Sequence, residues 1–238
     1  IYIGGYVEDA DIWSGQDIII QDGVNAGENG RIEAMGNISA RFFENAHIIS
    51  HSDIKCDYML NTTALAYGGI YLEGKRGSVI GGDVTGVRGI CIKACGSESY
   101  SKTVLRVGVT KEISSEYAKV LMVLKDIDTQ IDRFNQALQK LDILKKAGSD
   151  KFDETLNRKL LQSKIVKTAE KAKYEEKSRN LYTLVRESDR AVVRIDKNIY
   201  PGSRVFMGDK TYVPSTVFTH IALKKTSQGV LIRNYDSM

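Results

Sequence analysis

The sequence predicts a mainly β protein, a parallel β-solenoid interrupted by a long antiparallel coiled-coil helical hairpin. Three observations carry this prediction. Seventeen of the 21 glycines lie in residues 1–108, which indicates a segment dense in turns. A short aliphatic unit recurs through residues 1–96, and residues 113–141 carry an uninterrupted heptad seam. We therefore expect a solenoid over residues 1–109, the hairpin over 110–190, and strands that rejoin or cap the solenoid over 191–238.

The repeating unit has an aliphatic residue, a short Gly or polar corner, and a second aliphatic residue. Alternation at period two marks half-buried strands, and the recurrence marks stacked coils that bury their aliphatic side chains against one another. An antiparallel sandwich is the alternative, but Asp22-Gly23 and Asn29-Gly30 are too few hairpin signals to connect the whole segment. The starts of the units drift between 20 and 14 residues apart, at Ile12, Ile32, Ile48, Leu65 and Val79.

The first predicted helix has Thr110 as its N-cap and an apolar seam that steps by four and three residues. Its seam consists of Ile113, Tyr117, Val120, Leu124, Ile127, Ile131, Phe134, Leu138 and Leu141. Ala147-Gly148-Ser149-Asp150 ends this helix and begins the next, with Gly as the left-handed cap and Ser or Asp as the new N-cap.

The second predicted helix runs from about Lys151 to Asp189, and its seam is weaker. Its apolar positions are Leu156, Leu160, Tyr174, Leu181 and Leu184. Polar side chains fill the seam between them at Ser163, Lys167, Glu170 and Lys177. Two antiparallel helices return the chain to its starting point, so the later strands can rejoin the solenoid. The Tyr200-Pro201-Gly202 segment predicts a tight turn between these strands, because Pro fixes φ and Gly supplies a positive φ.

Charge is distributed unevenly along the chain. Residues 1–110 carry 9 Lys and Arg against 13 Asp and Glu, whereas residues 111–190 carry 18 against 14. A solvated helix face is the simplest interpretation of the basic stretch in the second helix, and a contact for an acidic partner is the functional one. The partner-binding candidates are Arg158, Lys159, Lys164, Lys167, Lys171, Lys173, Lys177 and Arg179.

Few residue patterns point to catalysis. Cys91 and Cys95 are about 13 Å apart on an extended strand, too far for one tetrahedral ion, and alternation turns both away from the core. Cys56 is expected to be buried, and three cysteines in 238 residues favour a reducing compartment. We therefore predict no catalytic residue, no metal and no cofactor.

An enzyme site on a solenoid face is the alternative, acting on a carbohydrate or a nucleotide. It would use Asp53, Asp57, His47 or His51, if stacking of neighbouring coils brings a histidine near Asp57 or Glu33. Nucleic-acid binding has little support, because the solenoid segment is acidic and the basic stretch has few aromatic residues. No stretch of the chain reaches the roughly 18 apolar residues that a membrane span needs. The chain begins at Ile1 and is interpreted as a fragment of a longer protein.

The order of segments resembles the flagellar assembly protein A family, long described as a domain of unknown function. The resemblance covers roughly residues 12–235 and rests on the stretch Gly81–Val84, the run Lys102–Val109 before the hairpin, and Ile199-Tyr200-Pro201-Gly202 after it. It implies a right-handed solenoid with an inserted hairpin, preceded in the family by an N-terminal domain that this chain lacks. It also implies a cytoplasmic bacterial protein tied in some members to flagellar assembly, with no established catalytic residues.

Together these observations favour a non-enzymatic scaffold linked to flagellar assembly or to organisation of the cell pole. Its partners would be other proteins that bind the coiled-coil arm, or further copies of the chain. A self-assembling structural polymer is a third possibility.

Overall fold

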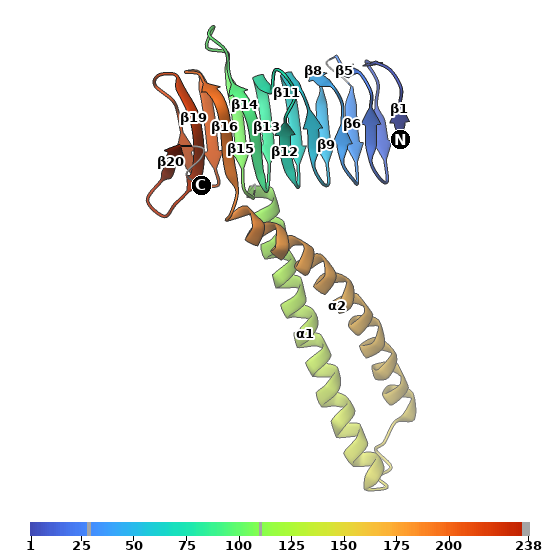
Figure 1. The fold of residues 1–238 in the computed structure, drawn as a ribbon. Helices are drawn as coiled ribbons and strands as arrows, with labels where there is room; N and C mark the ends of the chain where they lie inside the picture. Colours follow the sequence, from blue (N-terminus) through green and yellow to red (C-terminus); the bar gives the residue numbers. More distant parts are fainter. Residues whose placement is uncertain (28–29, 110, 235–238) are drawn as a thin grey trace. The chain divides into compact units, whose positions relative to one another are not determined.

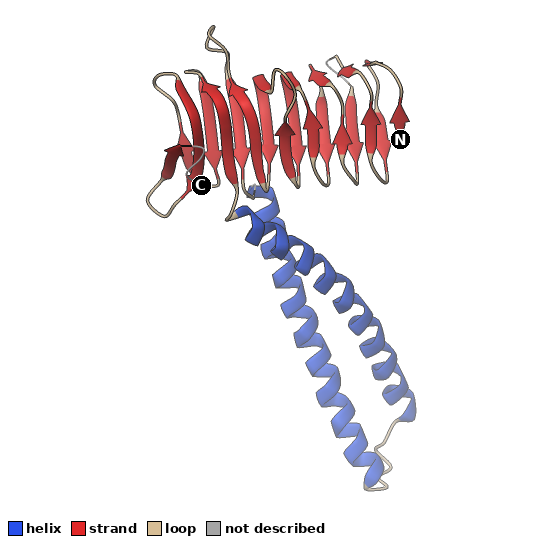
Figure 2. Cartoon of the chain, viewed as in Figure 1, coloured by secondary structure: helices blue, strands red, loops and turns tan. Residues whose placement is uncertain are grey.

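Parallel strand ladders form the body of the protein, and two long helices form a separate unit. The computed structural model describes residues 1–27, 30–109 and 111–234. Contacts divide the chain into Ile1–Thr110 with Leu184–Met238, and Lys111–Thr183. Apart from the two helices, the regular elements of the described chain are strands (Figures 1 and 2). This arrangement confirms the β-solenoid with a helical insertion that the sequence predicts.

Each coil of the solenoid contributes to three ladders in the described chain, and the longer strands β11 (Tyr58–Ala66), β13 (Ser78–Gly86), β14 (Gly89–Cys95) and β16 (Val192–Ile199) each run through two of them. The first ladder joins β1 (Tyr2–Ile3), β4 (Ile18–Ile20), β7 (Ile38–Ser39), β10 (Ile54–Cys56), β12 (Gly69–Leu72), the start of β14 and the start of β16. The second ladder joins β2 (Val7–Glu8), β5 (Gly23–Asn25), β8 (Phe42–Glu44), the starts of β11 and β13, and the ends of β14 and β16.

The third ladder carries the chain up to the insertion and resumes after it. It joins β3 (Ile12–Ser14), β6 (Arg31–Ala34), β9 (His47–Ser50), the ends of β11 and β13, β15 (Thr103–Val107) and β17 (Ser203–Met207). The pairings within these three ladders are parallel, so the antiparallel sandwich is excluded for this part of the chain.

The core is a set of aliphatic columns that run across the coils. In the first ladder, aligned inward residues are at most 1% exposed, namely Ile18, Ile38, Ile54, Ile70, Ile90 and Val193. The β-branched side chains suit the pleated surface, and each stacks on its equivalent in the next coil. From Ile18 to Ile90, consecutive members of this column are 20, 16, 16 and 20 residues apart in the sequence. The coils stay in register because differences in coil length are accommodated outside the aligned positions.

Two of the unit starts predicted from the sequence are wrong. Ile12, Ile32 and Ile48 are aligned as expected, but the column continues through Ala64 and Val84 rather than Leu65 and Val79. Leu65 is only half-buried and lies beside Ile49 on the outer side of the ladder. A shift of one residue turns a strand side chain to the opposite face, and the small Ala64 hides the inward position from an aliphatic pattern.

The last strands change the direction of pairing. β18 (Lys210–Tyr212) pairs antiparallel with β17, β19 (Phe218–Lys225) pairs antiparallel with β16, and β20 (Val230–Asn234) pairs antiparallel with β19. These pairings occupy the hydrogen-bonding edge of the final coil, which would otherwise accept another strand. Gly202 has φ of +92° in the turn after Pro201, as the sequence predicts.

Two helices, α1 (Lys111–Lys146) and α2 (Glu154–Ser188), make up the hairpin. Gly148 has φ of +59°, and the Ser149 backbone N–H donates to the Leu144 carbonyl at 3.1 Å, which confirms the left-handed cap. The N-cap of α2 is Asp153, whose Oδ1 accepts the Leu156 N–H at 3.0 Å. The predicted caps at Ser149 or Asp150 are therefore several residues too early, and Thr110 lies outside the described residues.

We expect Ile54→Ala to lower the free energy of unfolding by about 2–5 kcal/mol, because it opens a cavity in the first-ladder column. Lys55→Ala, at the neighbouring exposed position of β10, should change it by less than about 0.5 kcal/mol. Urea titrations followed by circular dichroism measure both values. Equal effects of the two substitutions would contradict the assignment of the inward face.

Candidate functional site

The seam of α1 is packed along its length. Ile113, Val120, Ile127 and Leu141 are at most 7% exposed. The other five seam residues are half-buried, namely Tyr117, Leu124, Ile131, Phe134 and Leu138. The seam therefore faces away from solvent, as its heptad spacing predicts.

The side of α2 that faces α1 is apolar at its ends and charged in its middle. Leu160, Tyr174 and Leu181 are buried or half-buried, and Lys167 and Glu170 between them are half-buried as well. These positions agree with the interrupted seam that the sequence predicts. Three other predicted seam positions, Leu156, Ser163 and Lys177, are exposed, so the prediction that Leu156 packs in the seam is wrong.

Ion pairs connect the two helices where apolar contacts are missing. Lys171 Nζ lies 2.7 Å from Asp128 Oδ1, and Lys177 Nζ lies 2.7 Å from Glu116 Oε1. Hydrogen bonds to these carboxylates raise the pKa of both lysines. Such exposed pairs contribute little stability, but they orient one helix against the other.

The eight cations proposed as a partner-binding set differ in their surroundings. Four of them lie within ion-pair distance of a carboxylate: Lys171 and Lys177 across the hairpin, Lys167 with Glu170 at 2.7 Å, and Arg158 with Glu154 at 3.7 Å. For the other four, no ion pair within 4.0 Å occurs among the described residues: Lys159, Lys164, Lys173 and Arg179. Lys167 and Lys171 are thus half-buried and paired with carboxylates of the hairpin itself.

Sequence reasoning missed three exposed apolar residues on α2. Leu161, Ile165 and Val166 are 44%, 68% and 64% exposed, although each is aliphatic. They lie off the seam, and a search restricted to one heptad register passes over them. The sequence signal that reveals them is a second apolar spacing of four residues, from Leu161 to Ile165, beside the first seam.

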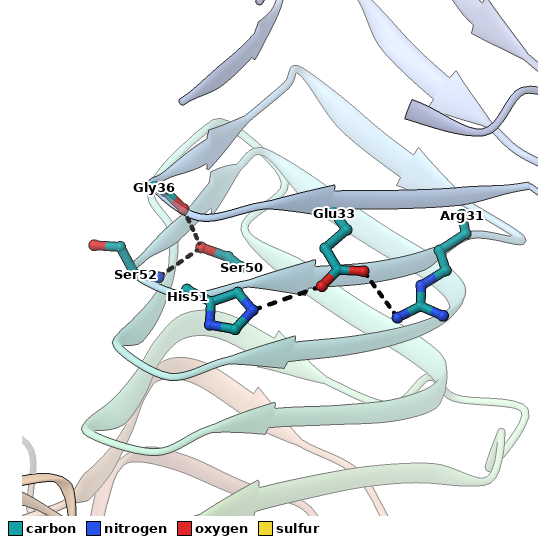
Figure 3. Close-up of polar contacts among 6 residues, drawn as sticks. All are labelled: Arg31, Glu33, Gly36, Ser50, His51 and Ser52. Carbon is teal, nitrogen blue, oxygen red and sulfur yellow. Dashed lines mark hydrogen bonds and ion pairs between the residues drawn. The ribbon is translucent and has the colours of Figure 1, made fainter. Parts of the chain in front are cut away.

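The histidine that the enzyme alternative requires does meet a carboxylate. His51 Nε2 lies 3.6 Å from Glu33 Oε1, and an Arg31 guanidinium nitrogen lies 2.8 Å from Glu33 Oε2 (Figure 3). The His51 ring also stacks on Tyr67, with centroids 4.9 Å apart and planes 12° apart. Stacking of neighbouring coils thus brings His51 to Glu33. His47 is exposed and is aligned with Arg31 of the neighbouring coil.

The corner beside this cluster is held by a buried hydroxyl. Ser50 Oγ donates to the Gly36 carbonyl at 2.9 Å and accepts the Ser52 backbone N–H at 3.1 Å (Figure 3). Ser50 is 0% exposed, so these bonds satisfy a polar group that would otherwise be buried without partners. These hydrogen bonds explain why the residues next to His51, Ser50 and Ser52, are polar, and no catalytic role is needed to account for them.

The aspartates named for the enzyme alternative bond to backbone of the following coil. Asp53 Oδ1 accepts the Gly69 N–H at 2.8 Å, and Asp57 Oδ1 accepts the N–H groups of Arg76 and Gly77 at 2.8 and 3.1 Å. Asp11 and Asp17 bind the next coil in the same way. These carboxylates therefore connect successive corners by hydrogen bonds. No group of three or more side chains that could hold a metal ion occurs in residues 1–27, 30–109 and 111–234.

Two cysteine predictions are correct and a third is wrong. Cys56 is buried as expected, and Cys91 is half-exposed on the outer side of β14. Cys95 is 0% exposed, although strict alternation from Ile90 turns it outward. The register of β14 against β16 shifts between Ile92 and Ala94, where the strand passes from the first ladder to the second. This irregularity reverses the alternation and points Cys95 into the core.

Strand ladders and hairpin together define a class: a parallel β-solenoid split by a two-helix insertion. The family comparison gives the same class, since the model "Flagellar Assembly Protein A beta solenoid domain" (FapA) matches residues 1–228. The chain therefore belongs to the FapA β-solenoid family. Comparison with curated proteins and with solved structures gave no match. Among the described residues, no helix is long and apolar enough to cross a membrane.

Replacing Asp57 by alanine should lower the free energy of unfolding by about 1–2 kcal/mol, because two backbone donors lose their acceptor. Asp57→Asn should recover part of this loss, since its amide oxygen can accept the same bonds. Chemical denaturation of both variants measures the effect. Unchanged stability in the alanine variant would show that Asp57 does not fasten the corner.

The folded protein should react with iodoacetamide at pH 8 at Cys91, while Cys56 and Cys95 react only after unfolding. Burial raises the pKa of both inner thiols, that of Cys95 to about 12, so neither is appreciably ionised at this pH. Mass spectrometry of isotope-coded alkylation products measures the order. Labelling of Cys95 as fast as Cys91 in folded protein would contradict the inward orientation of Cys95.

Proposed function

We propose that this protein is a non-enzymatic scaffold that binds other proteins through its helical hairpin and acts in flagellar assembly or in organisation of the cell pole. The single observation that carries the proposal is the insertion itself. A long hairpin with a packed seam leaves the solenoid after β15 and returns at β16, and these two strands belong to adjacent coils. The solenoid's own pairing needs nothing from the intervening residues.

Membership of the FapA family supports the connection to flagellar assembly through the family's name. The three cysteines form no disulfide with one another, which fits a reducing compartment, and we propose that the protein acts in the bacterial cytoplasm. The hairpin supplies exposed cations and exposed apolar side chains, which are the groups that a protein partner can use. Neither kind of group is required by the packing of α1 against α2.

A carbohydrate- or nucleotide-acting enzyme is a second candidate, favoured by the contact between His51 and Glu33. A turnover assay on such substrates tests it, with Glu33→Gln and His51→Asn as the informative variants. Loss of turnover in both variants, with stability retained, would favour the enzyme over the scaffold. The Asp53 and Asp57 carboxylates are already engaged by backbone donors, which leaves this candidate with fewer free groups.

Removal of the hairpin should leave a folded body that no longer captures its partners. The two preceding corners between the third and first ladders have two residues each, Tyr67-Gly68 and Val87-Arg88. Joining Gly108 directly to Ala191 reproduces this length and keeps β15 and β16 intact. We expect cooperative unfolding with a β-rich circular dichroism spectrum, together with loss of crosslinked partners.

The loss of partners is measured by chemical crosslinking followed by pull-down, with the intact chain and the shortened chain compared side by side. Sedimentation of both forms at several concentrations identifies self-association as a separate process. A shortened chain that folds and retains every partner would refute the proposed role of the hairpin.

A further inference from the structure

We propose that the outer face of α2 is a docking surface for an amphipathic helix with acidic flanks, supplied by a different protein. This inference rests on the proposed function and specifies where on the hairpin the partner binds. The outer face of α2 is defined by five exposed residues, Leu161, Ile165, Val166, Ala169 and Ala172.

The apolar part of this face lies away from α1. Leu161 and Ile165 are one helical turn apart and are 44% and 68% exposed. The half-buried residues on the same stretch of α2 are Leu160, Lys164, Lys167, Glu170 and Lys171, which mark the side facing α1. The exposed aliphatic side chains therefore form a second stripe, and the hairpin leaves it uncovered.

Small residues continue the stripe over the next turns. Ala169 and Ala172 are exposed and extend the line of Leu161 and Ile165 by spacings of four and three. The distance between two packed helices depends on the side chains at the contact, and alanines allow a close approach. Large aliphatic side chains followed by alanines thus form a surface on which another helix can pack.

Charge around the stripe determines the chemistry of the partner. Six cations and one carboxylate lie between Arg158 and Lys173, and the carboxylate, Glu170, is paired with Lys167. Lys159, Lys164 and Lys173 have no ion pair within 4.0 Å in the described part of the chain. A partner with acidic residues beside its apolar face would supply the missing charges and be steered toward this surface.

The same features argue against two other occupants. A second copy of the chain offers α1 as its remaining helix. Its exposed apolar residues, Leu121, Met122 and Ile143, are accompanied by exposed charges of both signs, as in Lys125, Asp126, Asp132 and Arg133, which do not complement a predominantly basic surface. An interfacial membrane helix needs a broad apolar face with Trp, Phe or Leu. The outer face of α2 has three large aliphatic residues and no aromatic one, which suits a narrow helix contact.

Site-specific photo-crosslinking in the intact chain tests the proposal. A photoreactive amino acid replaces Val166, and Ile143 of α1 is the matched control because it is 66% exposed on the other helix. We expect the Val166 probe to crosslink, in cells that express the protein, to a segment of another polypeptide with apolar spacings of three and four and flanking Asp or Glu. The Ile143 probe should give no such product.

Substitutions then measure the contribution of each feature to this crosslink. Ile165→Ser should lower the yield about tenfold, as expected for loss of one packed apolar anchor, whereas Ile143→Ser should leave it unchanged. Lys159→Glu combined with Lys173→Glu should lower the yield further and weaken its dependence on salt. Both lysines are exposed, so the circular dichroism spectrum should be retained in all variants.

Several outcomes would overturn the docking surface. These are a crosslink only to the chain itself, sedimentation with anionic phosphatidylserine vesicles that depends on Ile165, and equal yields from Val166 and Ile143. If the hairpin deletion abolishes partner binding while Ile165→Ser does not, the scaffold proposal stands and this surface is wrong. If the deletion loses no partner, the scaffold proposal itself fails.

Discussion

In-register stacking of inward aliphatic residues is the constraint on which the solenoid depends. A strand such as β10 buries Ile54 only because Ile38 and Ile70 occupy the same position in the coils on either side. Each coil is too thin to make a core of its own, so stability comes from the interfaces between coils. The corners must keep this register while the loop lengths vary, and the carboxylates of Asp53 and Asp57 do so by bonding to backbone N–H groups of the next coil.

This constraint explains why the insertion takes the form of a hairpin. A segment inserted between β15 and β16 must begin and end at the same corner, because Ile90 has to meet Val193 in the first ladder. Two antiparallel helices satisfy this requirement at any length, provided that they pack against each other. The α1 seam provides that packing, and the pairs Asp128–Lys171 and Glu116–Lys177 supplement it where α2 lacks apolar residues. In the described chain, the packing of α1 against α2 does not use the residues of the outer face of α2.

Sequence patterns predicted the architecture well where inward residues are large, and poorly where they are small or where a strand bends. Ile12, Ile32 and Ile48 are aligned as the repeat predicts, but Ala64 is too small to stand out in an aliphatic pattern, which therefore points to the outward Leu65. Cys95 points inward because β14 changes ladder within a continuous strand, and no local residue pattern marks that change. The heptad spacing predicted which residues of α1 are buried, whereas the exposed Ile165 and Val166 could be recognised only once the side facing α1 was known.

The polar groups of the two units differ in how far the fold satisfies them, and this difference favours binding over chemistry. In the solenoid, Asp57 accepts two backbone donors, Ser50 bonds across a corner, and Glu33 is shared between Arg31 and His51. A catalytic carboxylate or base needs a free position that faces substrate, and these groups are largely committed to neighbouring coils. On α2, by contrast, Lys159 and Lys173 are exposed, as are Leu161 and Ile165, and in the described residues no carboxylate lies within ion-pair distance of either lysine. A protein interface can pair exposed charges and cover exposed apolar side chains when it forms, and we propose that a partner does so on the hairpin.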